Sequence, residues 1–160
     1  MNQPKNSAVL NIILLFSIFS LLIAYFIQYI LDYKPCNLCL LERVPYILTI
    51  IIIILNLIIS KFEKIFIILL SIIFTVATFI SFYHFGIEQG VFSESLVCNL
   101  SNESNNLSKE DLLKQLSEKV ISCKEVSFKV FGLSLATINA FISLILAAIT
   151  TKLFLNYEKK

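Results

Sequence analysis

Four apolar stretches of about 20 residues or more constrain the fold of this chain more than any other feature of its sequence. They span residues 8–31, 40–60, 66–85 and 131–152. Composition agrees, because 58% of the 160 residues are hydrophobic and only 15% are charged, against about 25% charged in a soluble domain. Apolar segments of this length cross a bilayer as helices that satisfy their own backbone hydrogen bonds. The sequence therefore predicts an all-α integral membrane four-helix bundle, one domain over residues 1–160.

Counting the spans places all four cysteines on one side of the membrane. Residues 32–39 form the first loop and residues 86–130 the third, and both lie opposite the termini. Cys36 and Cys39 are in the first of these loops, and Cys98 and Cys123 are in the third. The lysines on the two sides do not differ enough to decide the orientation. Because disulfide chemistry belongs in an oxidising compartment, we expect the cysteines outside.

The third loop contains a polar stretch and a short helical pattern. Residues 99–106 are rich in Asn and Ser and indicate a linker. Ser108 and Asp111 then have the spacing of a helix cap, and apolar residues recur at helical spacing up to Ile121. We expect a short amphipathic surface helix that leads to Cys123. Two placements stay open, on the membrane surface or packed on the bundle.

The segment PCNLCLLER (residues 35–43) places a dithiol and charges between two apolar stretches. A C-x-x-C at a helix start brings one sulfur close to free backbone N–H groups, which lowers the pKa of that thiol. Arg43 follows Cys39 by four residues and so lies on the same face of a helix. An arginine at this depth needs a partner or a polar cavity, which points to a Cys39 thiolate or a bound anion. For Glu42, the sequence leaves open pairing with Arg43 or Lys34, or exposure to the lipid headgroups.

Pro45 limits how the second helix can run. A proline inside a helix breaks or kinks it, whereas a proline in the first turn is well tolerated. We therefore expect a helical turn at the dithiol and a bend at or just before Pro45.

The cysteines admit several interpretations. Two structural disulfides, a zinc site and unpaired apolar residues are the simplest. Zinc is disfavoured, and we expect no metal, because Cys98 and Cys123 are 25 residues apart and the single histidine, His84, lies on another segment. A C-x-x-C closes too small a loop to be a useful structural crosslink. Redox chemistry is the better interpretation of the dithiol.

Three motifs together resemble the DsbB family, the quinone-dependent disulfide bond formation proteins of bacterial inner membranes. They are PCNLCLLER after the first helix, YHFGIEQG (residues 83–90) and FGLSLATIN (residues 131–139). The resemblance covers nearly the whole chain. It implies a thiol:quinone oxidoreductase that uses ubiquinone or menaquinone and reoxidises a DsbA-like periplasmic oxidase of thioredoxin fold. It also implies periplasmic cysteines and cytoplasmic termini.

The resemblance assigns a role to each cysteine. Cys98 resembles the thiol that forms a mixed disulfide with the soluble oxidase, and Cys123 its partner. Cys36 resembles the sulfur that Cys123 then attacks, which gives a Cys36–Cys123 intermediate from resting Cys36–Cys39 and Cys98–Cys123 disulfides. Cys39 resembles the sulfur that faces the quinone, and Arg43 the residue that holds quinone and thiolate together.

His84, at the end of the third apolar stretch, has two open interpretations. It is an interfacial anchor, or it binds a quinone carbonyl or relays a proton.

Three rival functions remain. A vitamin K epoxide reductase-like enzyme has its C-x-x-C after the loop pair, the reverse of the order here. A structural tetraspan protein with a disulfide-crosslinked loop would not explain the position of Arg43 beside a dithiol. A family member dedicated to one substrate oxidase stays open. Because net charge is only +2 with no basic stripe, no nucleic acid partner is expected.

Overall fold

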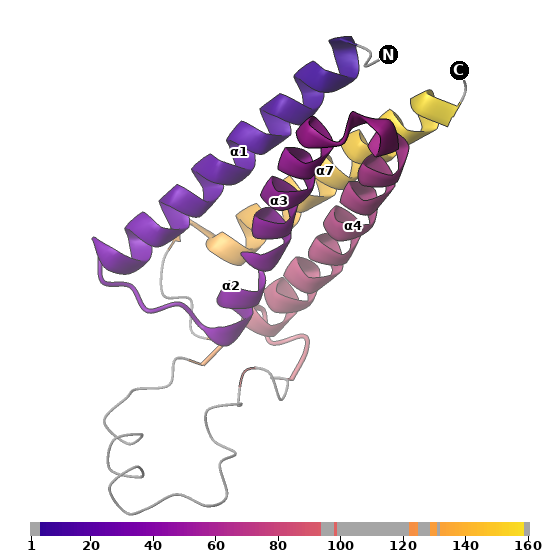
Figure 1. Cartoon of the computed structure of the whole chain (residues 1–160). Coiled ribbons are helices and arrows are strands. Elements are labelled where there is room, and N and C mark those ends of the chain that lie inside the picture. The colour runs from indigo at the N-terminus through magenta and orange to yellow at the C-terminus, as the bar shows by residue number, and fades with distance from the viewer. Residues whose placement is uncertain (1–3, 94–97, 99–121, 125–128, 131, 159–160) are drawn as a thin grey trace, which may run out of the picture.

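The structure is a computed structural model that describes residues 4–93, 98, 122–124, 129–130 and 132–158. Four long helices run side by side, as Figure 1 shows: α1 (Pro4–Tyr29), α3 (Val44–Ile58), α4 (Glu63–Glu88) and α7 (Leu135–Glu158). The short helix α2 (Asn37–Leu41) precedes α3, and the 3-10 turn η1 (Ser60–Phe62) joins α3 to α4. Strands β1 (Lys129–Val130) and β2 (Leu133–Ser134) form a small antiparallel hairpin that leads into α7.

The four-helix membrane bundle predicted from the sequence is confirmed. Four helical segments are long and apolar enough to cross a membrane: Ser7–Tyr29, Asn37–Ile58, Glu63–Glu88 and Leu135–Asn156. The N- and C-terminal ends lie together at one end of the bundle, and α2 lies at the other (Figure 1). The predicted linker at 99–106 and the predicted amphipathic helix after Ser108 lie outside the described residues.

The start of the fourth helix differs from the expected position. The apolar stretch begins at residue 131, but α7 begins at Leu135 because β1 and β2 pair first, with Val130 opposite Leu133. Gly132 has a φ of 84° in the turn between them. This left-handed conformation suits glycine and reverses the chain before the helix starts.

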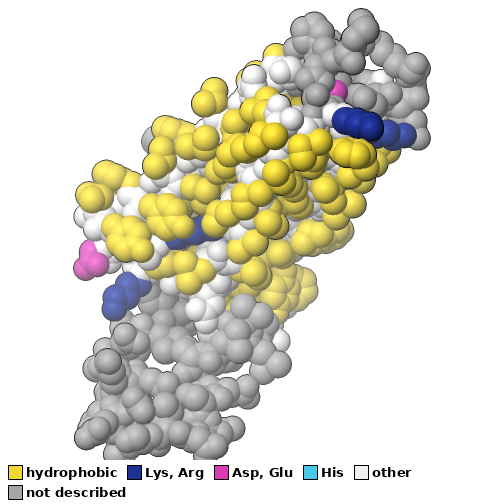
Figure 2. All heavy atoms as spheres, in the orientation of Figure 1, with side chains coloured by type: hydrophobic (Ala, Val, Ile, Leu, Met, Phe, Trp, Pro, Cys, Tyr) yellow, Lys and Arg dark blue, Asp and Glu magenta, His cyan; other side chains and the backbone are white. Residues whose placement is uncertain are grey.

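The helices pack through a narrow interior and leave their outer faces apolar. The buried core gathers side chains from all four helices, with Leu10, Ile53, Phe74 and Leu146 among its members. Small polar side chains such as Ser17 are also fully buried, which lets membrane helices approach closely. Hydrophobic side chains cover most of the face in Figure 2. Such a surface is stable in lipid rather than in water.

As predicted, a break within the second span separates α2, at the dithiol, from α3. Helix α2 ends at Leu41, and α3 starts at Val44 with Arg43 as its N-cap residue and Pro45 in its first turn. The proline ring occupies a position where no helical N–H is required. Because the chain turns here, the neighbouring side chains of Glu42 and Arg43 reach different partners.

A short chain of hydrogen bonds ties three of the long helices together. The Tyr46 hydroxyl of α3 donates to Asn139 Oδ1 of α7 at 2.5 Å. The Asn139 amide in turn donates to Ser81 Oγ of α4 at 2.8 Å. Asn139 thus fixes the position of α7 against both neighbours.

We predict that Asn139→Ala lowers the free energy of unfolding by about 1 kcal/mol, in line with interhelical hydrogen bonds in membranes. The substitution leaves the Tyr46 hydroxyl and the Ser81 hydroxyl without their shared partner. Phe141→Ala is the matched control, because Phe141 on the same helix is 60% exposed. Denaturant titration in detergent measures both. Equal stability of the two variants would contradict the bridging role of Asn139.

Candidate functional site

The dithiol lies at the N-terminus of α2, and Cys36 is the cap residue of that helix. Its backbone is extended, with φ −71° and ψ 167°, and its Sγ accepts a hydrogen bond from the Cys39 N–H at 3.2 Å. A cap residue supplies an acceptor to the unpaired N–H groups of the first turn. The sulfur that the sequence places near free N–H groups is therefore that of Cys36. Both cysteines are free thiols in this structure.

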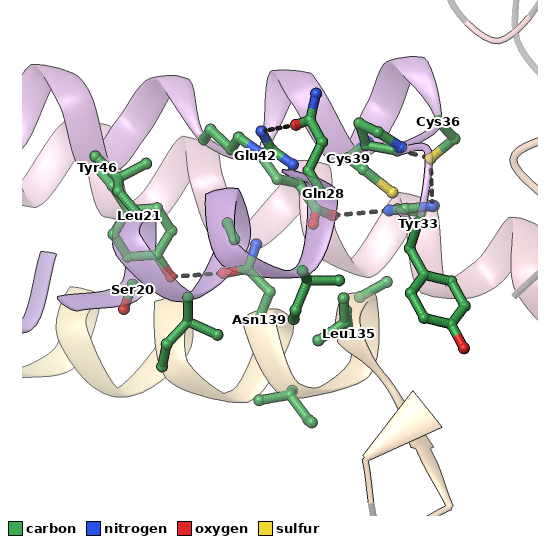
Figure 3. A pocket seen from close by; sticks show the side chains of 18 of the residues that line it. Ser20, Leu21, Gln28, Tyr33, Cys36, Cys39, Glu42, Tyr46, Leu135 and Asn139 are labelled. Carbon is green, nitrogen blue, oxygen red and sulfur yellow. Dashed lines mark hydrogen bonds and ion pairs between the residues drawn. The ribbon is translucent and has the colours of Figure 1, made fainter. Parts of the chain in front are cut away.

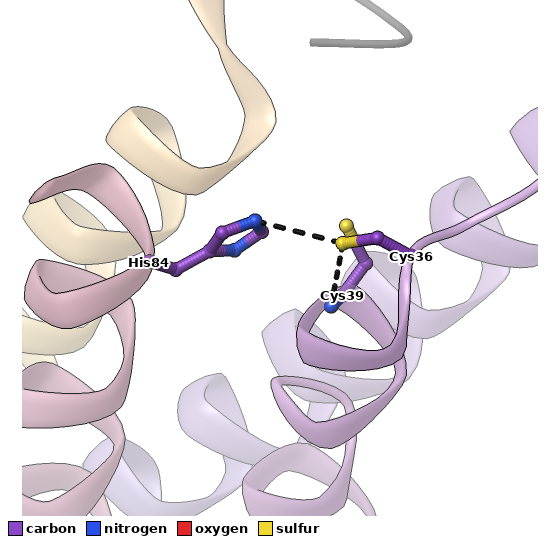
Figure 4. A group of neighbouring side chains, drawn as sticks. All are labelled: Cys36, Cys39 and His84. Atoms are coloured by element: carbon purple, nitrogen blue, oxygen red, sulfur yellow. Dashed lines mark hydrogen bonds between the residues drawn. The ribbon is translucent and has the colours of Figure 1, made fainter. Parts of the chain in front are cut away.

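His84 of α4 joins the dithiol to Glu42. Its Nε2 lies 3.5 Å from Cys36 Sγ, and its Nδ1 lies 3.0 Å from Glu42 Oε1 (Figure 4 shows the sulfur side). The histidine is only 2% exposed. An interfacial anchor would present its ring to the headgroups, so the anchor interpretation is wrong. Glu42 is also buried and pairs with His84, a partner that was not among those considered from the sequence.

A second carboxylate approaches the same histidine. Glu88 Oε1 lies 4.0 Å from His84 Nε2, one helical turn further along α4. The Ser134 hydroxyl donates to Glu88 Oε2, and Ser134 Oγ accepts from the Thr137 N–H at 3.1 Å. Ser134 thus caps the start of α7 and holds Glu88 beside the histidine.

The surroundings of Cys36 favour its thiolate. A hydrogen bond from the Cys39 side chain has the largest effect, and the contact with His84 adds to it. Burial acts in the opposite direction, but the net result lowers the pKa of Cys36 to about 5. One thiolate supported by a neighbouring thiol is the usual arrangement in a reactive C-x-x-C.

Arg43 turns from the dithiol toward α1. Its Nη1 donates to Gln28 Oε1 at 2.6 Å, and its guanidinium lies over the Tyr25 ring at 5.0 Å from the centroid. The sequence did not identify Gln28 or Tyr25 as partners. They supply the polar and aromatic contacts that a membrane-buried arginine requires.

A cavity of about 250 Å³ brings these groups together, as Figure 3 shows. Its polar lining includes Cys36, Cys39, Arg43, His84 and Glu88. Its apolar lining comes from α1 and α7 and includes Ala24, Ile27, Ile138 and Ile142. The arrangement suits a small molecule with a polar head and an apolar body.

The second cysteine pair packs directly against the first. Cys98 and Cys123 form a disulfide with their Cα atoms 5.9 Å apart. Both are buried in one cluster with Cys36, Leu38 and Ile87. The two pairs, far apart in the sequence, are therefore neighbours in space.

The structure thus gathers every candidate residue named from the sequence at one end of the bundle. It adds Gln28 as the partner of Arg43, and Glu42 and Glu88 as the carboxylates around His84. The spacing of four residues between His84 and Glu88 is a usable signal on a helix. Nothing in a single sequence indicates the other two pairings.

The chain was compared with known proteins. The family described as "Disulfide bond formation protein DsbB" matches residues 6–153. An uncharacterized protein of Rickettsia prowazekii (strain Madrid E), RP370, is 33% identical over 141 residues, which cover 86% of this chain and 82% of that protein.

We predict that Cys36 stays reactive toward a small alkylating reagent in mildly acidic solution. With a pKa of about 5, the thiolate persists as pH falls and is lost only as pH drops through that value. An ordinary cysteine, with a pKa of about 8.5, loses roughly two orders of magnitude in reactivity between pH 8 and pH 6. Mass spectrometry of the Cys36 peptide from the reduced protein gives the rate at each pH. A fall in rate like that of an ordinary cysteine would contradict the thiolate assignment.

Proposed function

Because the chain belongs to the DsbB family of disulfide bond formation proteins, we propose that it is a membrane thiol:quinone oxidoreductase. Its substrate in this proposal is a reduced periplasmic oxidase of thioredoxin fold, similar to DsbA, which it reoxidises. The observation that carries the proposal is the buried cluster that holds the Cys98–Cys123 disulfide against Cys36. This proximity supports the transfer of electrons between the two pairs by thiol–disulfide exchange.

The first exchange takes place at the third-loop pair. A thiolate of the reduced oxidase attacks Cys98, so the Cys98–Cys123 bond breaks and Cys123 leaves as a thiolate. Cys123 then attacks Cys36 of an oxidised Cys36–Cys39 pair, which gives a Cys36–Cys123 disulfide and a Cys39 thiolate. Each step breaks one S–S bond and forms one, as thiol–disulfide exchange requires.

The second exchange returns the loop pair to its disulfide. The second thiol of the oxidase displaces Cys98 from the mixed disulfide, and the oxidase leaves oxidised. Cys98 then attacks Cys123, which reforms their bond and releases Cys36. Low-pKa thiols leave faster, so the lowered pKa of Cys36 assists this step. Two electrons now reside in the Cys36–Cys39 dithiol, the form that the structure holds.

The cavity beside Cys39 suits a quinone. Its apolar lining from α1 and α7 matches a hydrophobic ring and the start of an isoprenoid tail, and Arg43 provides a fixed cation at the polar end. A quinone supplies an acceptor for two electrons and two protons. In this proposal Arg43 would hold the polar head of the quinone, and His84 Nε2, 3.5 Å from Cys36 Sγ, would accept the proton of that thiol and return it.

We place the cysteine end of the bundle in the periplasm and both termini in the cytoplasm of a bacterium, in its inner membrane. Support comes from the requirement of disulfide exchange for an oxidising compartment. The termini lie at one end of the bundle and α2, which carries the dithiol, lies at the other, the arrangement that this orientation requires (Figure 1).

The test is quinone-dependent oxidation of a reduced DsbA-type protein by the purified protein. We expect sustained turnover, beyond the oxidising equivalents stored in the protein's own disulfides, only when ubiquinone or menaquinone is added, and in proportion to the quinone reduced. Cys36→Ser and Cys39→Ser should each abolish quinone reduction and keep the helical circular dichroism of the wild type. Near-normal turnover in either variant would overturn the role of the dithiol. Many turnovers in the absence of quinone would overturn the reaction itself.

Arg43→Ala should raise the KM for quinone. A charge-assisted hydrogen bond contributes about 1.5–3 kcal/mol, or roughly 10- to 150-fold in KM. Arg43→Lys should fall between Ala and wild type, because it keeps the charge and loses the planar fork of donors. Wild-type KM and turnover in Arg43→Ala would remove Arg43 from the site. Lower thermal stability with unchanged KM would make it a helix anchor instead.

A further inference from the structure

Three metal-binding donor atoms converge at the reduced dithiol. Cys36 Sγ, Cys39 Sγ and His84 Nε2 all lie within 4.8 Å of one another. The sequence disfavoured zinc because its only histidine lies on a different segment, but α4 brings that histidine to the dithiol. We propose that the dithiol form of this protein binds one Zn²⁺ ion through Cys36, Cys39 and His84, and that the ion holds the pair reduced.

The spacing of the donors suits tetrahedral zinc. With Zn–S of about 2.3 Å and Zn–N of about 2.0–2.1 Å, a sulfur and a nitrogen ligand stand about 3.6 Å apart. The distance from Cys36 Sγ to His84 Nε2 is 3.5 Å. Little movement of these two residues is therefore needed to admit the ion.

Glu42 prepares the histidine as a ligand. A carboxylate only accepts hydrogen bonds, so His84 Nδ1 carries the hydrogen that Glu42 Oε1 receives at 3.0 Å. Zinc binding releases any proton on Nε2, and the lone pair of that nitrogen then points to the side of Cys36. Histidine ligands of zinc almost always donate their other N–H in this way, which fixes the ring and raises its basicity.

The net charge of the zinc complex also suits its buried position. Two thiolates balance the charge of Zn²⁺, so the complex with a neutral histidine carries no net charge. A neutral group avoids most of the cost of placing an ion in a low-dielectric interior. The three donor residues line the cavity, so a water molecule can complete the tetrahedron without adding charge.

Zinc binding depends on the redox state of the pair. A Cys36–Cys39 disulfide has no thiolate to offer, so only the dithiol form is a ligand. Coordinated sulfurs are withheld from oxidation until the ion leaves. That zinc binds here is inferred from geometry alone. That bound zinc would stop the dithiol from reducing quinone rests on the proposed function.

The test uses the full chain with Cys98→Ser and Cys123→Ser, because reduction would otherwise expose two further thiols in the same cluster. Metal-free, reduced protein is titrated with Zn²⁺ against a chromophoric chelator, and with Co²⁺ for its visible spectrum. We expect one equivalent of Zn²⁺ and the absorption bands of tetrahedral thiolate-bound Co²⁺. Protein oxidised to the Cys36–Cys39 disulfide should bind neither metal.

Matched variants test whether zinc binding requires His84 and its partner Glu42 or only the two cysteine thiolates. His84→Ala should weaken binding by more than 100-fold, and Glu42→Gln by about 10-fold, as for other partners of metal ligands. Glu63→Gln is the control for Glu42→Gln, because Glu63 is a buried acid at the far end of α4. It should leave the zinc affinity unchanged. Circular dichroism checks that each variant is folded.

Several outcomes would overturn the proposal. They are sub-stoichiometric zinc, equal binding by the oxidised protein, or wild-type affinity in folded His84→Ala. If His84→Ala does not fold, a Co²⁺ spectrum of the parent protein without a nitrogen ligand overturns it as well. None of these readouts involves quinone or a partner oxidase, so the proposed function can fail while the zinc site stands.

Discussion

The hydrogen-bonded pair of Glu42 and His84 is the interaction on which the rest of the site depends. It joins the corner between α2 and α3 to α4, and both side chains are buried. Without His84, the buried Glu42 carboxylate would lose the hydrogen bond that His84 Nδ1 donates to it, which is costly in a membrane. The contact also sets the direction of the ring, so that Nε2 faces Cys36. A single pairing thereby fixes the helix corner, the dithiol and the cavity beside them.

The break at the α2–α3 corner explains how two adjacent charges serve different purposes. In an unbroken helix, Arg43 would lie one turn from Cys39 on the same face. Because α2 ends at Leu41, Arg43 turns to Gln28 and Tyr25 of α1 instead, while Glu42 faces α4. The arginine still lines the cavity of Cys39. Its own partners, Gln28 and Tyr25, hold it there.

Local patterns in the sequence were enough to predict the local structure. Apolar length predicts the four spans, the C-x-x-C predicts a sulfur at a helix start, and Pro45 predicts the bend. Contacts between distant segments were not predictable. His84 meets Glu42 across 42 residues and Arg43 meets Gln28 across 15, and both pairings depend on how the helices pack. The late start of α7 was missed because β-hairpin pairing overrode an apolar stretch that also suits a helix.

The Ser134 hydroxyl makes two hydrogen bonds, one that caps the first turn of α7 and one to the carboxylate of Glu88. From β2 a series of polar contacts runs through Ser134 and Glu88 to His84, and from His84 to Cys36. One hydroxyl before α7 thus belongs both to the start of that helix and to the polar contacts that end at the Cys36 sulfur.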